Sequence, residues 1–145
     1  MRRVYRLSAI AAGSIAIATS AAAFEAVTLE DYSGEELFGR FCASCHGESA
    51  HGDGPVARGL VAVVPDLTMI TRRYGTFPAA RIRDTIDGRG VEIAEHGTRV
   101  MPVWGYEFWV EAGADVVAEA QMRDVIVRLV EYIRSLQEDE APEKN

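Results

Sequence analysis

The chain has 145 residues, about the length of one domain, and its hydrophobic fraction of 48% favours a globular core over disorder. Its 15 basic and 22 acidic side chains give a formal charge of −7, which argues against nucleic acid as a partner. The two cysteines are too few for a disulfide framework.

The first 23 residues have the pattern of a secretory signal peptide. Three arginines precede an apolar stretch from Leu7 to Ala23 that ends in an Ala-x-Ala pattern. An uncleaved membrane anchor is the alternative, but these 17 residues fall short of the roughly 20 apolar residues that a spanning helix needs. We therefore predict a signal peptide at 1–23, a mature domain at 24–145, a periplasmic location and no integral membrane segment after cleavage.

The mature chain is more acidic than the precursor. Removing the first 23 residues takes away three arginines and no acid, which leaves 12 basic and 22 acidic side chains and a formal charge of −10. Such a charge favours a basic protein partner or simply keeps the protein soluble.

The first predicted elements surround a loop rich in glycine. Residues 30–41 carry apolar side chains at helical spacing, with Ser33 and Glu36 placed for a capping box. Residues 47–64 favour a loop with one turn of helix near 56–60, and Pro65 to Thr68 favour a turn in which Asp66 caps the next element.

The second half contains two further helices. One begins at Pro78 and runs to about Asp87, where Gly88 stops it, and a second loop then leads to Met101. The last has an apolar face from Met122 to Leu136. We predict an all-α fold of about four or five short helices whose long loops wrap a bulky group.

Cys42, Cys45 and His46 form a Cys-x-x-Cys-His motif, the attachment pattern of a c-type haem. In this chemistry the two thiols form thioethers with the porphyrin and the histidine becomes the proximal iron ligand. A disulfide between Cys42 and Cys45 would be a strained redox-active bond rather than a structural link. We predict one covalently bound haem c per chain, held by Cys42 and Cys45, with His46 on the iron.

The motif has two other interpretations. A zinc site would use Cys42, Cys45, His46 and His51, but adjacent Cys45 and His46 rarely bind one tetrahedral ion. A thioredoxin-like dithiol would need a βαβ setting, which the sequence does not favour.

The second axial ligand decides between electron transfer and catalysis. The candidates are Met69, Met101, Met122, His51 and His96. Met122 falls on the apolar face of the last helix, Met69 follows a turn, and both histidines are typical of solvated loops. Met101 lies in a loop of glycine and proline far from the motif, where a ligand from the opposite side of a haem is expected.

The chain resembles the class I, single-haem, bacterial c-type cytochromes over most of its mature length. The resemblance is carried by CASCHG with GDGP, by PDLT, by MPVWG, and by Gly34 and Phe38 before the motif with Tyr132 in the last helix. It implies Met101 as the distal ligand, Pro65 as the carbonyl acceptor for the proximal imidazole, and Trp104 near the haem. Arg72, Arg73 and Arg81 are candidates for the propionates, and the path of residues 105–121 is left open.

The predicted function is single-electron transfer between a donor and an acceptor redox protein, without bond-making chemistry. One alternative is a haem enzyme in which Met101 is displaced. Another is a haem-bearing subunit of a membrane-bound or multi-subunit dehydrogenase or oxidase, docked through residues 105–121. Arg2-Arg3 would suit export in the folded state, but haem attachment after export requires an unfolded passenger, so general secretory export is expected.

Overall fold

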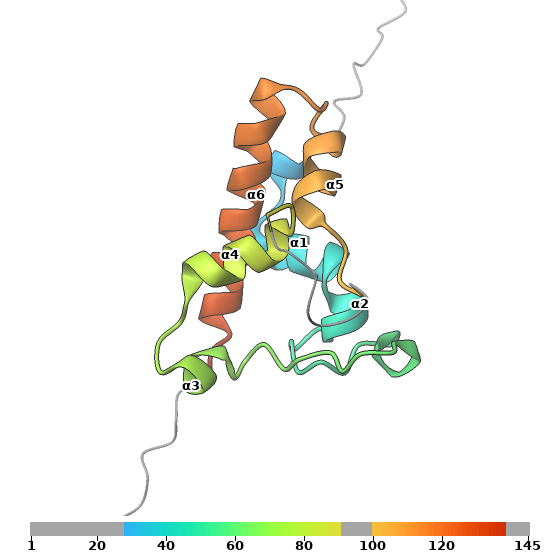
Figure 1. The fold of residues 1–145 in the computed structure, drawn as a ribbon, viewed down its shortest axis with the longest axis vertical. Coiled ribbons are helices and arrows are strands. Elements are labelled where there is room, and N and C mark those ends of the chain that lie inside the picture. Colours follow the sequence, from blue (N-terminus) through green and yellow to red (C-terminus); the bar gives the residue numbers. More distant parts are fainter. Residues whose placement is uncertain (1–27, 91–99, 139–145) are drawn as a thin grey trace, which may run out of the picture.

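The structure is a computed structural model that describes residues 28–90 and 100–138 (Figure 1). The regular structure in these ranges is all helical, as the sequence predicts. Its elements are η1 (Leu29–Asp31), α1 (Gly34–Phe41), α2 (Ala43–His46), η2 (Ala57–Gly59), α3 (Ile70–Tyr74), α4 (Ala79–Asp87), α5 (Trp104–Glu111) and α6 (Val116–Ser135). The described part thus has six α-helices rather than four or five, because α2 and α3 are single turns that no apolar periodicity marks.

The predicted helix before the motif divides in two. The 3₁₀ helix η1 comes first, and α1 then begins after Ser33, whose Oγ accepts a hydrogen bond from the Glu36 backbone at 3.2 Å. The Glu36 carboxylate accepts in return from the Ser33 backbone at 2.8 Å, so the predicted capping box is present.

The helix α6 forms the spine of the molecule, and α1, α4 and α5 pack against it (Figure 1). It begins six residues before the predicted apolar face, because Asp115 caps it by accepting from the backbones of Val117 and Ala118 at 2.8 Å each. Residues 105–121, whose path the sequence left open, form most of α5 and the start of α6.

The core lies mainly between α1 and α6. Phe38 packs on Tyr132 with ring centroids 5.4 Å apart, and a Cβ on Gly34 would lie 2.9 Å from the Tyr132 Cβ. The predicted pairing of Gly34 and Phe38 with Tyr132 is therefore confirmed. The largest fully buried side chains are Phe38, Phe108, Leu37, Ile70, Met122, Ile126, Leu129 and Val125.

The end of α6 holds the turn that leads into α3. Gln137 accepts from the Thr71 backbone at 2.8 Å and donates to the Leu67 carbonyl at 2.8 Å. Asp66 does not cap α3, which starts at Ile70; its carboxylate accepts from the backbone and hydroxyl of Thr68 at 2.9 and 2.6 Å. This prediction was wrong, because Asp66 closes a local turn instead.

Candidate functional site

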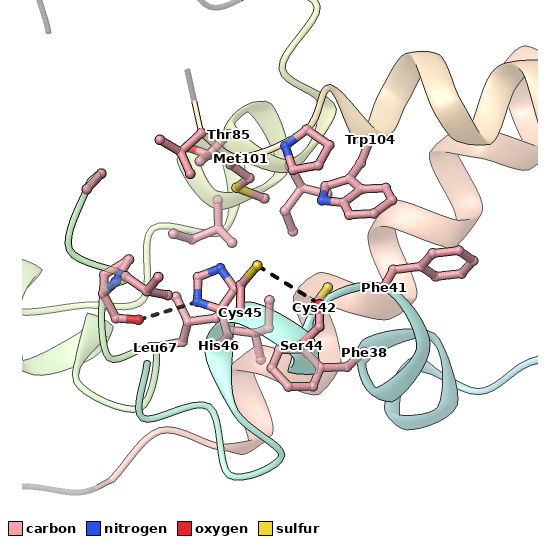
Figure 2. A pocket seen from close by; sticks show the side chains of 18 of the residues that line it. Phe38, Phe41, Cys42, Ser44, Cys45, His46, Leu67, Thr85, Met101 and Trp104 are labelled. Atoms are coloured by element: carbon pink, nitrogen blue, oxygen red, sulfur yellow. Dashed lines mark hydrogen bonds between the residues drawn. The ribbon is translucent and has the colours of Figure 1, made fainter. Parts of the chain in front are cut away.

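A cavity of about 450 Å³ lies beside the core, with the motif on one side and the segment before α5 on the other (Figure 2). Most of its walls are apolar. It is lined by Phe38, Phe41, Cys42, Ser44, Cys45, His46, Leu60, Ala62, Val63, Val64, Pro65, Leu67, Ile70, Ile82, Thr85, Ile86, Val100, Met101, Pro102, Trp104 and Ile133.

The junction of α1 and α2 brings the motif to this cavity. The Cys42 backbone donates to the Phe38 carbonyl at 2.8 Å and closes α1, and the His46 backbone donates to the Cys42 carbonyl at 2.9 Å within the next turn. Cys42 is 8% exposed, whereas Cys45 is partly exposed, and neither forms a disulfide. Burial, with a smaller contribution from Cys45, raises the pKa of the Cys42 thiol to about 12, so this thiol is protonated at neutral pH.

The imidazole of His46 is oriented by the loop on the far side of the motif. Its Nδ1 lies 3.4 Å from the carbonyl oxygen of Pro65, which leaves Nε2 for a metal (Figure 2). Desolvation lowers the pKa of His46, and the contact with Pro65 opposes this in part. The ring is therefore neutral at neutral pH, the form that binds a metal.

The glycine-rich stretch after the motif has a packing role. Its backbone folds over α2, with Gly52 donating to the His46 carbonyl at 2.7 Å and Gly54 to the Cys45 carbonyl at 3.1 Å. A Cβ on Gly54 would lie 2.6 Å from the Ala43 carbonyl oxygen. Only glycine allows this approach, so the loop can hold Pro65 against His46.

Met101 comes from the segment before α5 and lines the cavity on the side away from His46 (Figure 2). It is partly exposed, and Pro102 and Trp104 line the cavity beside it. Trp104 also stacks on Phe108, with centroids 5.5 Å apart. Met101 and Trp104 thus both line the cavity.

The other candidate ligands lie elsewhere. Met122 is fully buried in the core, and Met69 precedes α3 without lining the cavity. His51 points to Asp66, with Nδ1 3.4 Å from the carboxylate. His96 lies outside the described residues.

Within residues 28–90 and 100–138, no three His, Cys, Asp or Glu side chains converge to hold a metal ion. Arg72, Arg73 and Arg81 do not line the cavity, and two of them have other partners: Arg73 donates to the Asp66 carbonyl at 2.6 Å and Arg81 covers the Tyr74 ring.

Sequence reasoning did not identify two of the cavity walls. One is the loop from Leu60 to Val64, a short apolar run without helical periodicity. The other is the face of α4 with Ile82, Thr85 and Ile86. The i, i+4 spacing of Ile82 and Ile86 marks one face of this helix but does not show whether it meets protein or a bound group.

The residues fit a covalently held haem. The cavity lies in the range of small-molecule and cofactor sites, about 300–1,000 Å³, and its walls are mostly apolar. Two thiols stand at one side, and a neutral imidazole and a thioether face the space between them (Figure 2). This donor set is the His/Met pair of c-type haem proteins.

None of the helices in the described ranges has the length and apolar character to cross a bilayer. No curated protein and no solved structure matches the chain. Residues 30–119 match the family described as cytochrome C oxidase, cbb3-type, subunit III, and this match covers well over half of the 145 residues. The chain therefore belongs to this family and is a mono-haem c-type cytochrome.

Proposed function

We propose that this protein carries single electrons on one haem c between a donor and an acceptor redox protein. Cys42 and Cys45 would hold the haem through thioethers, and His46 and Met101 would ligate its iron. The observation that carries the proposal is the single cavity shared by the motif and Met101.

When bound, the haem supplies an iron that cycles between two oxidation states by one electron. The protein residues fix its surroundings. Pro65 orients the His46 ring through Nδ1, and the thioether of Met101 favours ferrous iron and so raises the reduction potential relative to a second imidazole. With His46 and Met101 both bound to the iron, no position would remain for small molecules, which would favour electron transfer over catalysis.

Replacing Met101 tests the ligand set. In the haem-loaded protein, Met101→Ala opens the sixth position. If the methionine fills that position more than about nine-tenths of the time, carbon monoxide affinity rises roughly tenfold or more. Met69→Ala is the matched control, because this methionine does not line the cavity. A wild-type protein that binds carbon monoxide as tightly as Met101→Ala would instead support the alternative of a haem enzyme with a displaceable ligand.

The covalent attachment has its own test. A pyridine haemochrome spectrum and the intact mass of protein matured with its haem machinery should show one haem on two thioethers. Free, alkylatable thiols at Cys42 and Cys45 in such material would refute the proposal. The same mass shows whether residues 1–23 are removed, as we propose for a protein exported to the periplasm.

A second arrangement is a permanent subunit of an oxidase, favoured by the description of the matching family. In that case α5 and the start of α6 are the proposed docking elements. Gel filtration of native extract separates the two: elution at the size of the single chain supports a free carrier, and co-elution with a larger haem protein supports a subunit.

A further inference from the structure

Arg89, which follows α4, links that helix to α6 through two carboxylates. Arg89 donates from Nε and Nη2 to the two carboxylate oxygens of Asp87, at 2.6 and 2.9 Å. It donates from Nη1 and Nη2 to the carboxylate of Glu119, at 2.9 and 3.2 Å. Asp87 ends α4 and Glu119 lies in the first turn of α6, so Arg89 bridges the two helices.

The first turn of α5 packs directly against the Asp87 carboxylate. Gly105 is buried, and a Cβ there would lie 2.7 Å from Cγ and 2.8 Å from the carbonyl oxygen of Asp87. This contact leaves no room for a side chain. The end of α4 therefore fixes the start of α5.

Met101 is tied closely to that start. The Val103 carbonyl accepts from the backbones of Tyr106 and Glu107, at 3.0 and 3.2 Å. Val103 thus belongs to the hydrogen bonding of α5, and Met101 lies two residues before it. A shift of α5 away from Asp87 would move the Met101 sulfur relative to His46.

We propose that Asp87, Arg89 and Glu119 form a clamp that positions Met101 on the haem iron. Arg89 holds the Asp87 carboxylate against α6, and Asp87 in turn packs against Gly105 at the start of the helix that follows Met101. Its members act through the backbone and are positioning residues, not ligands. The inference rests on the proposed function, in which Met101 is the distal ligand.

The two ion pairs of the clamp are bidentate and partly buried. Both ion pairs use two nitrogen–oxygen contacts, and the side chains of Asp87, Arg89 and Glu119 are only 26%, 33% and 33% exposed. Bidentate pairing fixes orientation as well as distance. A methionine–iron bond competes with ligands from solution, so its occupancy depends on how well the protein pre-orients the sulfur.

The test uses Arg89→Gln in the haem-loaded protein. We expect carbon monoxide to bind the reduced haem about fivefold faster than in wild type, since partly exposed ion pairs of this kind contribute on the order of 1 kcal/mol. The near-infrared absorption band of the methionine–iron bond should weaken in the oxidised protein. Glu119→Gln removes one arm only and should give a smaller change of the same sign.

Arg83→Gln is the matched control. Arg83 lies on α4 and pairs with Asp84 at 3.2 Å on the exposed surface, without contact to the clamp. The carbon monoxide binding rate and the near-infrared band of Arg83→Gln should equal those of wild type.

Three results would overturn the clamp. Arg89→Gln could lower the unfolding midpoint and leave the rate and the band unchanged, which would show a purely structural role. Should Arg89→Gln fail to fold, an unchanged rate and band in Glu119→Gln would decide against positioning. A wild-type protein without the band, binding carbon monoxide as fast as Met101→Ala, would remove Met101 as the ligand and the clamp with it, and this failure appears before any clamp variant is made.

Discussion

Gly34 shows how one missing side chain sets the position of the motif. It is the first residue of α1, and a Cβ there would meet the Arg128 carbonyl and the Tyr132 Cβ of α6. Because α1 ends at Phe41 and Cys42 follows, any displacement of α1 moves the cysteines and His46 as well. The close approach of α1 to α6 therefore fixes the position of the motif, which forms one side of the cavity.

We predict that Gly34→Ala destabilises the protein by about 1–3 kcal/mol, because the added methyl group overpacks a contact made by backbone atoms. Urea unfolding of the haem-loaded protein measures the change. Gly39→Ala is the matched control on the same helix, since nothing lies within 4 Å of a Cβ there. The control should be neutral or more stable by about 0.5–1 kcal/mol, because alanine restricts the unfolded chain. Equal effects of the two substitutions would contradict the close crossing.

At the scale of the elements, the sequence predicted a helix end correctly where the residues that start or stop the helix lie at that end. The capping box of Ser33 and Glu36 predicts the start of α1, and Gly88, with φ of 71°, ends α4 where expected. The motif was identified from the spacing of Cys42, Cys45 and His46, and Met101 was selected from its loop position and the family resemblance. The helix ends and the motif depend on neighbours within a few residues.

The features that the sequence did not predict depend on contacts between distant segments. Arg89 meets Glu119, 30 residues along the chain, and no periodicity marks that pair. The loop from Leu60 to Val64 is apolar because it lines a cavity, which its own residues cannot show. Tertiary packing decided both cases.

The link between α4 and α6 gives a defined pH dependence. Hydrogen bonding from Arg89 is the main effect that lowers the pKa of Asp87 and of Glu119 below their ordinary values. A lowered folded-state pKa stabilises the protein above the unfolded pKa, about 3.9 for Asp and 4.3 for Glu, and this contribution is lost as the pH falls through the folded value.

We therefore predict that Arg89→Gln has a lower free energy of unfolding than wild type at pH 7. This difference in free energy should narrow below about pH 4. Urea unfolding of both proteins at several pH values between 3 and 7 measures it. Comparing the two proteins cancels the protonation of His46, which both share. A difference in the free energy of unfolding that stays constant down to pH 3 would mean that Arg89 does not lower the pKa of the two carboxylates.

At the scale of the whole molecule, the cavity and the hydrophobic core share side chains. Phe38, Ile70, Ile86 and Ile133 are buried core residues and also line the cavity. The helices α1, α3, α4 and α6 each contribute one of them. A haem bound in the cavity would thus complete the core, and its loss should affect most of the fold.

Removing the haem gives the last prediction. Cys42→Ala with Cys45→Ala would prevent the thioethers from forming, and a haem-free protein would leave the apolar cavity of about 450 Å³ without its occupant. Because four helices pack around this cavity, the lost contacts would remove much of the stability of a typical domain, about 5–15 kcal/mol. We expect the haem-free protein to retain part of its helical circular dichroism, to lose the near-ultraviolet signal of Trp104 and Trp109, and to unfold without a sharp transition. A cooperative transition near the midpoint of the haem-loaded protein would show instead that the α1–α6 core folds on its own, with the cavity closed by movement of the loop from Leu60 to Val64.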